Sequence, residues 1–332
     1  SSKLVIGIGA AAFLALMATS VAQVLGTQED PALAAYRSGR YDEAVKALQQ
    51  KIGSGQDVPH DHRHLFRALF EVGRYMEAEK VARGFINQHP ESPDLHNSLG
   101  EVLWTRGHLD EAETAFQEAS NRRADDWLTA ELNLGIAAFE RGRRTEAMQR
   151  FDRFIDFYNN GEATTSGDLT AVGIACQYLG ISDSALYQDA LKAFDEAVAA
   201  DPNDLRPRIL TGNLFLEKYD SGNAATELGT VLQLNPYHPQ ALLSMGRRMR
   251  FDGDENAIAM AESALEINPN LVGARVYLSR QLLSSERFDD AIEEIKPALE
   301  TNPVSLEALP ILAAAHYLRG DTIGFEEIRD QI

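Results

Sequence analysis

The sequence predicts an all-α fold built as a solenoid, and two regularities in the second half of the chain lead to this prediction. Prolines recur there with a nearly constant period of about 34 residues, and an alanine stands twelve residues before each of them. Such a period, with small residues at fixed offsets, is typical of helical solenoids, in which each unit packs on its neighbours. The prolines are Pro202, Pro236, Pro269 and Pro303. A chain of 332 residues with this period need not divide into two globular domains, as its length alone would suggest.

The composition is that of a folded protein with an acidic surface. Apolar residues make up 44% of the chain, and the net charge is −19, of which residues 161–332 contribute −14. Such a charge excludes nucleic acid and anionic lipid headgroups as ligands, because binding them requires a basic surface. The acidity serves solubility or attracts a basic partner. The single cysteine, Cys176, excludes an intrachain disulfide and a cysteine metal cluster, and its apolar neighbours indicate a packed helix position.

The first residues of the chain are apolar enough to cross a membrane. The segment from Leu4 to Leu25 has no charged residue and 22 positions, about 33 Å of helix at 1.5 Å per residue, which matches the hydrocarbon core of a bilayer. Lys3 precedes it and acidic residues follow, so the positive-inside rule places the repeats on the periplasmic side of a bacterial inner membrane. Residues 1–27 are therefore predicted to be an N-terminal membrane anchor, in which Gly7 and Gly9 allow close packing against other membrane helices.

A signal segment is the alternative interpretation of this stretch. Ser20-Val21-Ala22 has the small residues that a signal peptidase accepts. Cleavage after Ala22 would release the rest of the chain into the periplasm, whereas an uncleaved segment would still anchor it.

Each unit of the chain follows one pattern of small, aromatic and proline residues. One unit shows it with Leu99-Gly100, Gly107, Ala112 and Phe116. The further matches are Gly39 and Tyr41; Gly73, Tyr75, Ala78, Phe85 and Pro90; Leu134, Gly135, Gly142, Ala147 and Phe151; Gly173, Ala190, Phe194 and Ala197; Gly212 and Ala224; and Gly320. On these residues the chain resembles the tetratricopeptide repeat (TPR) family. The resemblance implies a right-handed superhelical solenoid of about nine helix-turn-helix units over residues 31–332.

One segment interrupts the repeats. Residues 159–168 are polar and contain two glycines, and extra residues follow Gly180 before the next second helix begins. Such a composition favours a loop. We therefore expect a joint at 159–168 between two sub-solenoids, residues 31–158 and 169–332.

Residues 185–332 carry a narrower likeness. The segments 214–219 and 235–243 resemble the repeat region of bacterial extracytoplasmic TPR proteins in which the repeats precede a peptidase MA-like, gluzincin-type domain. The zinc motif H-E-x-x-H of those relatives is absent, because no histidine in this sequence is followed by glutamate. No P-loop, dinucleotide fingerprint or nucleophile elbow occurs either. The sequence therefore predicts no catalytic residue, no cofactor and no enzyme activity.

One histidine cluster has the spacing of metal ligands. His60 and His64 would share one face of a helix, and Asp57 or Asp61 could add a carboxylate. The same residues also suit the polar start of a helix after Pro59.

The partner-binding candidates follow from the resemblance, which implies that the first helices line a concave groove. At groove positions stand Arg63, Arg67, Asn97, Glu101, Trp104, Phe139, Tyr178, Asn213, Arg247, Arg250 and Arg280. Relatives that clamp a peptide carboxylate use a Lys/Asn pattern, which Glu101 after Asn97 disfavours here. The basic spot Arg247-Arg248-x-Arg250 could receive an acidic segment, or it could pair with Asp252, Asp254 and Glu255.

These features together predict a non-enzymatic accessory or scaffold subunit. It would sit in the membrane through residues 4–25 and bind protein subunits of a multi-subunit membrane complex, for example a photosynthetic or respiratory one. Two alternatives remain open at this point: the regulatory region of a longer membrane-bound metallopeptidase, and a periplasmic adaptor or chaperone in envelope biogenesis.

Overall fold

The computed structural model describes residues 30–55, 59–122 and 127–332, and these contain eighteen helices and no strand. The helices form nine antiparallel pairs. The first helices of the pairs are α2 (Pro31–Arg37), α4 (Pro59–Glu71), α6 (Pro93–Thr105), α8 (Trp127–Glu140), α10 (Ser166–Leu179), α12 (Arg206–Glu217), α14 (Pro239–Phe251), α16 (Val272–Ser284) and α18 (Ala308–Arg319). The second helices are α3 (Tyr41–Gly53), α5 (Tyr75–Gln88), α7 (Leu109–Arg122), α9 (Arg144–Asn159), α11 (Leu186–Ala200), α13 (Ser221–Leu234), α15 (Ala257–Ile267), α17 (Phe288–Thr301) and α19 (Thr322–Arg329).

The predicted membrane anchor, with Gly7 and Gly9, lies outside the described residues. None of the helices that the structure does describe has the length and hydropathy needed to cross a membrane.

Complementary side-chain sizes hold each helix pair together. A Cβ placed on Gly100 would lie 2.4 Å from the ring of Phe116 on the second helix, so the glycine makes room for the ring. Gly135 with Phe151 and Gly173 with Phe194 repeat this arrangement. In the pair α4/α5 the sizes are exchanged, because Phe66 stands at the glycine position and Ala82 at the aromatic one. The glycine and aromatic pattern of the sequence is therefore a packing pattern within each pair.

The pairs stack into a curved solenoid with the first helices on the inside. Most consecutive first helices contact each other closely, as in α4–α6, α6–α8 and α8–α10, whereas consecutive second helices of the described residues scarcely do. Helices on the inner side of a bend lie closer together than those on the outer side. The concave surface is therefore built from first helices, as the resemblance implies.

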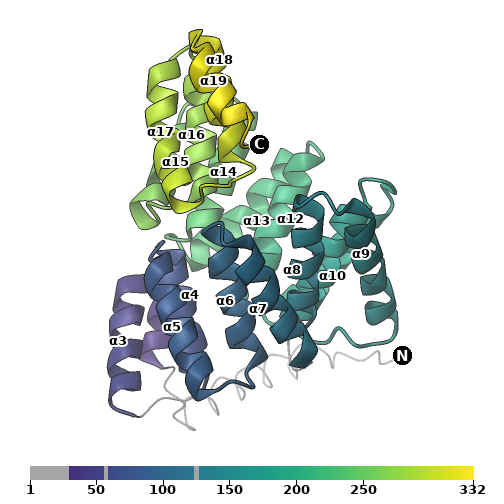
Figure 1. The fold of residues 1–332 in the computed structure, drawn as a ribbon. Coiled ribbons are helices and arrows are strands. Elements are labelled where there is room, and N and C mark those ends of the chain that lie inside the picture. Colours follow the sequence, from purple (N-terminus) through teal and green to yellow (C-terminus); the bar gives the residue numbers. More distant parts are fainter. Residues whose placement is uncertain (1–29, 56–58, 123–126) are drawn as a thin grey trace, which may run out of the picture.

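The solenoid curves far enough to contact itself. We call α2–α11 the first coil and α12–α19 the second coil. Figure 1 shows α14–α19 lying above α3–α6 of the first coil. Each inter-coil contact joins a turn within a pair of the first coil to the residues directly after a second helix in the second coil, nearly 200 residues further along the chain.

The middle inter-coil contact shows the geometry most fully. The side-chain amide of Asn268 donates to the Tyr75 hydroxyl at 3.1 Å, and its Oδ1 accepts from the backbone N–H of Asn270 at 3.1 Å. The Asn270 amide in turn donates to the Gly73 carbonyl at 2.9 Å. Gly73 has a φ of +73°, and a Cβ there would lie 2.2 Å from Asn268 Oδ1. Only glycine satisfies both the backbone conformation and the close approach.

The flanking repeats form the same contact. Asn235 donates to the Tyr41 hydroxyl at 2.9 Å, and Asn302 donates to the Trp104 carbonyl at 3.5 Å. A Cβ on Gly39 would lie 2.2 Å from Asn235 Oδ1, and one on Gly107 would lie 2.6 Å from Asn302 Oδ1. Three consecutive repeats of the first coil are thus held by three consecutive repeats of the second.

The predicted joint at 159–168 contains the loop between α9 and α10. Phe154 and Phe157 before this loop share one hydrophobic cluster with Ala171 and Val172 after it. The core therefore continues through this segment, and the division into two sub-solenoids at 159–168 stays a prediction.

Candidate protein-binding groove

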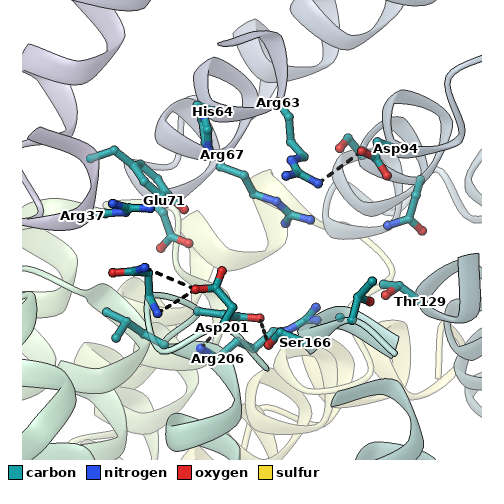
Figure 2. Close-up of a pocket in the computed structure, with 18 of the residues that line it drawn as sticks. Arg37, Arg63, His64, Arg67, Glu71, Asp94, Thr129, Ser166, Asp201 and Arg206 are labelled. Carbon is teal, nitrogen blue, oxygen red and sulfur yellow. Dashed lines mark hydrogen bonds and ion pairs between the residues drawn. The ribbon is translucent and has the colours of Figure 1, made fainter. Parts of the chain in front are cut away.

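A cavity of about 550 Å³ lies in the groove of the first coil, where residues of the second coil such as Arg206 and Asn235 also line it, and its charged side chains are of both signs. Arginine side chains from α2, α4 and α12 share it with the carboxylates of Glu71, Asp94, Asp201 and Asp204. In Figure 2 Arg63 and Arg67 reach into the cavity from α4, with Asp201 and Arg206 on the opposite wall. Since positive and negative groups occur together, this cavity selects no single sign of charge.

A network of hydrogen bonds and ion pairs links the first helices in this part of the groove. The Arg67 guanidinium binds both carboxylate oxygens of Glu101, at 2.6 and 3.2 Å. Glu101 also accepts from the Asn97 amide at 2.9 Å, and Asn97 accepts from Asn133 at 3.0 Å. Arg63 pairs with Asp94 at 3.2 Å. Arg63, Arg67 and Asn97, which the sequence predicts as binding residues, are therefore each bonded to a side chain of the next repeat.

The histidine pair proposed as a metal site lies on α4. His60 is exposed at the start of the helix, and His64 lines the cavity. Burial, together with the neighbouring Arg63 charge, lowers the pKa of His64 to about 4, so this ring is neutral at pH 7. Asp61 forms an ion pair with Lys51 at 2.9 Å. Within the described ranges no three His, Cys, Asp or Glu side chains are grouped so that they could hold a metal ion.

The aromatic candidates pack between repeats. The Tyr178 ring stacks on Phe151 with ring centroids 4.5 Å apart and meets Phe139 edge to face at 4.9 Å. Burial raises the pKa of Tyr178 to about 12. Trp104 is partly buried against the hydrophobic core of the first coil. Both rings fill space between neighbouring helix pairs and remain partly exposed, so their role as partner-binding residues stays a prediction.

The groove of the second coil is different. Arg247 and Arg250 on α14 and Arg280 on α16 are exposed, and among the described residues none of their guanidinium groups has a hydrogen bond or ion pair. The adjacent Arg248 pairs with Asp252 at 2.7 Å. The basic spot therefore divides: Arg248 forms the internal pair that the sequence offered as an alternative, and the others do not. Asn213 on α12 is half-buried.

The surrounding protein partly encloses the guanidinium group of Arg247. Although the side chain is exposed, it lies across the groove from α14 to α16, where a Cβ on Gly273 would be 3.6 Å from Nη2. Partial desolvation by the surrounding protein lowers the pKa of Arg247; the Glu307 charge acts against this, and the Arg280 charge acts with it. The Tyr277 hydroxyl donates to the Gly246 carbonyl at 3.4 Å and so holds the two helices together beside these arginines.

Arg67, Glu101, Arg247 and Arg280 occupy one equivalent position in four repeats. Glu101 directly follows the packing glycine Gly100, and Arg247 directly follows Gly246. Arg67 stands one repeat before Glu101, and Arg280 stands one repeat after Arg247. Neighbouring repeats thus present an arginine beside a glutamate in the first coil and an arginine beside an arginine in the second.

The residues of the inter-coil contacts were not identified from the sequence. The signal was nevertheless present: asparagine precedes the proline at 235, 268 and 302, whereas aspartate stands at 201. Either side chain can accept from the backbone two residues on, as Asp201 does from Asn203 at 2.9 Å. Only asparagine can also donate a hydrogen bond to the opposite coil.

Comparisons with known proteins identify the repeats. Two family models, both described as tetratricopeptide repeat, match residues 63–126 and 278–322 in one case and 129–160 in the other. Among solved structures, one titled as an APC/C hetero-tetramer of Cut9 and Hcn1 is similar, with a TM-score of 0.48, 15% identity and 84% of this chain covered. Yeast Tom70 is similar with a TM-score of 0.49, 18% identity and 83% of this chain covered. The chain spans 53% and 57% of the length of these two proteins. A search of curated proteins found no match.

Proposed function

We propose, from the premise that this chain is a tetratricopeptide repeat protein, that it is a non-enzymatic scaffold that holds protein subunits together at a membrane. Repeat solenoids of this kind present extended concave surfaces to protein partners. The observation that carries the proposal is the groove of the second coil, where arginine side chains from two helices are exposed and have no partner among the described residues. Exposed groups of this kind suit an external partner.

The inter-coil contacts support the role of a rigid platform. They fix the second coil above the first at three consecutive repeats, through Asn235, Asn268 and Asn302. A preorganised groove loses less conformational entropy when it binds than a flexible one does.

The membrane part of the proposal rests on the sequence. The uncharged stretch from Leu4 to Leu25 would anchor the chain in a bacterial inner membrane with the repeats in the periplasm. An anchor and a groove on one chain would make two attachments to a multi-subunit membrane complex, such as a photosynthetic or respiratory one. Two linked attachments raise the effective concentration for the second contact, so modest contacts in the groove suffice.

A purification experiment tests this function. Membranes from cells that express the chain with an affinity tag after Ile332 are extracted in mild detergent, and the co-purifying proteins are identified by mass spectrometry. We expect a stoichiometric set of integral membrane proteins. A chain that purifies alone, or only with transient envelope clients, would contradict the proposal and favour a periplasmic adaptor.

The anchor is tested separately. Replacing Gly7 and Gly9 by leucine should reduce recovery of the membrane proteins while leaving the chain in the membrane fraction, because bulky side chains block close helix packing. The intact mass of the mature chain provides the control. A mass that lacks residues 1–22 would show cleavage after Ala22 and exclude a permanent anchor.

A further inference from the structure

The strongest remaining feature is the repeated arginine position of the second coil. Arg247 and Arg280 stand at equivalent positions on α14 and α16, and Arg250 lies one helical turn beyond Arg247. These charges act on neighbouring groups: Arg280 lowers the pKa of Arg247, and Arg250 and Arg247 both lower that of the Tyr277 hydroxyl. Three cations therefore share one short stretch of groove.

This arrangement is unusual within the molecule. Arginines at many other places pair with carboxylates, including Arg67 with Glu101 at the equivalent position and Arg275 with Glu294 at 2.7 Å on α16 itself. Residues 161–332 carry far more acidic than basic residues, so this part of the chain is rich in carboxylates. Like charges on adjacent helices repel each other, and an arginine beside an arginine therefore suits an anion that arrives from outside.

One carboxylate acts on Arg247 without forming an ion pair with it. Glu307, at the start of α18, influences the charge of Arg247. The structure shows no ion pair between them among the described residues, and Glu307 itself is exposed.

We propose that Arg247, Arg250 and Arg280 bind an acidic, extended segment of a partner protein. This inference rests on the proposed scaffold function and names the chemistry of its groove. Neighbouring packed helices are about 8–10 Å apart, and an extended chain in the polyproline II conformation advances about 3.1 Å per residue with three residues per turn, so side chains three positions apart lie on one face. A segment that crosses from α14 to α16 would therefore place two acidic residues three positions apart, one opposite the arginines of each helix. Guanidinium groups bind carboxylates in a two-pronged geometry that lysine cannot reproduce.

The same geometry disfavours long polyanions. The arginine cluster is confined to two helices, and the protein around it is strongly acidic. A nucleic acid or polyphosphate chain would extend beyond the cluster into repulsive surface. A short acidic stretch within a protein segment satisfies the three cations without this cost.

Peptide binding to the full chain tests the proposal. The probe is a fluorescent twelve-residue peptide of glycine and serine with two glutamates three positions apart, measured by fluorescence anisotropy. We expect Arg247→Ala and Arg280→Ala each to weaken binding at least tenfold, and Arg280→Glu to abolish it. Arg248→Ala provides the matched control, because it removes the same charge from α14 at a residue that is paired with Asp252. We expect the control to change binding less than twofold.

Several results would overturn the inference. The first is equal affinity for the same peptide with glutamine in place of glutamate. A second is unchanged affinity in Arg280→Glu, provided that circular dichroism shows a folded protein. A third is tighter binding of a single-stranded oligonucleotide than of the peptide. Affinity purification with Arg280→Glu separates the two proposals: membrane subunits that still co-purify with a variant that no longer binds the peptide would leave the scaffold function intact and place its contact elsewhere.

Discussion

The first and second coils use the same repeat positions for opposite purposes. In the first coil Arg67 binds Glu101 of the next repeat, and the turns at Gly39, Gly73 and Gly107 each receive an asparagine from the second coil. In the second coil the equivalent pair is Arg247 and Arg280, with no partner for either guanidinium in the part of the chain that the structure describes.

The turns of the second coil differ in the same way. In the described structure nothing lies within 4 Å of a Cβ placed on Gly253 or Gly320. At two other turns of this coil, Tyr219 and Glu286 adopt positive φ values of 63° and 58°. A side chain is therefore tolerated at a turn that faces solvent, at the cost of backbone strain, but not at a turn that faces the other coil. The repeat pattern thus serves internal assembly at three turns of the first coil, Gly39, Gly73 and Gly107, and leaves exposed turns in the second coil, as it also does at Gly142 of the first.

The largest effect should come from filling an inter-coil contact. Gly73→Ala forces a Cβ against Asn268 and also strains the positive φ, and should lower the free energy of unfolding by about 2–4 kcal/mol. Gly253→Ala has only the backbone strain and should lower it by about 1 kcal/mol. Thermal unfolding followed by circular dichroism measures both. Equal losses in the two variants would mean that the coils do not meet at Gly73.

A second contrast concerns the equivalent arginines. Arg67→Ala leaves the Glu101 carboxylate, 16% exposed, without its bidentate partner, and should lower the free energy of unfolding by about 1–3 kcal/mol. Arg280→Ala removes no internal pair and should change it by less than about 0.5 kcal/mol. Denaturant unfolding of the two variants checks this difference. A loss in Arg280→Ala as large as that in Arg67→Ala would show that the second groove is also internally paired.

Acidification should weaken the first coil through His64. The pKa of His64 in the folded chain is lowered to about 4 by burial, below the ordinary value of about 6.5. The folded state therefore binds fewer protons than the unfolded state between these pH values, and stability falls as the pH drops through this window. From pH 7 to pH 5 we expect a loss of about 1–2 kcal/mol that His64→Gln lacks. Thermal midpoints of the two proteins, measured from pH 7 to pH 5, test this prediction. An equal decrease of the midpoint with pH in both proteins would contradict it.

The smallest effect should come from a single hydroxyl. Tyr75→Phe removes the acceptor of the Asn268 amide, which is buried, and should lower the free energy of unfolding by about 1 kcal/mol. Tyr219, 81% exposed, has no such contact in the described structure, and Tyr219→Phe should be neutral. Thermal unfolding of the pair measures the value of one inter-coil hydrogen bond. A neutral Tyr75→Phe would show that close packing at Gly73 alone holds the coils together.

Much of the fold could be predicted because its determinants are local. The interval between Pro202, Pro236 and Pro269 sets the length of each unit, and the glycine and aromatic positions set how its two helices pack. These contacts lie within one repeat or between neighbours, so their signature repeats along the sequence. The groove candidates on α4, α6, α14 and α16 followed from the same register.

Whether each groove residue is paired within the chain or available to a partner could not be predicted. Arg63 and Arg247 look alike in the sequence, yet Arg63 pairs with Asp94, 31 residues away, and Arg247 has no such partner in the described structure. Tyr178 reads as a groove aromatic but stacks on Phe151. Whether a side chain is engaged or available depends on the neighbouring repeat that happens to face it.

The sequence by itself determined the helical repeat and its period, because each depends on residues a few positions to one repeat apart, and the resemblance built on that repeat implied the inward position of the first helices. Only the tertiary structure decided that the solenoid meets itself, with Asn268 against Gly73 and Tyr75 nearly 200 residues away. Small rotations between successive helix pairs add up along a solenoid, and the sequence pattern of one repeat does not predict the total rotation. Where that sum brings two coils together, the asparagine and glycine of an ordinary repeat become an inter-coil contact. On the second coil, the same groove position leaves its arginines open to a partner.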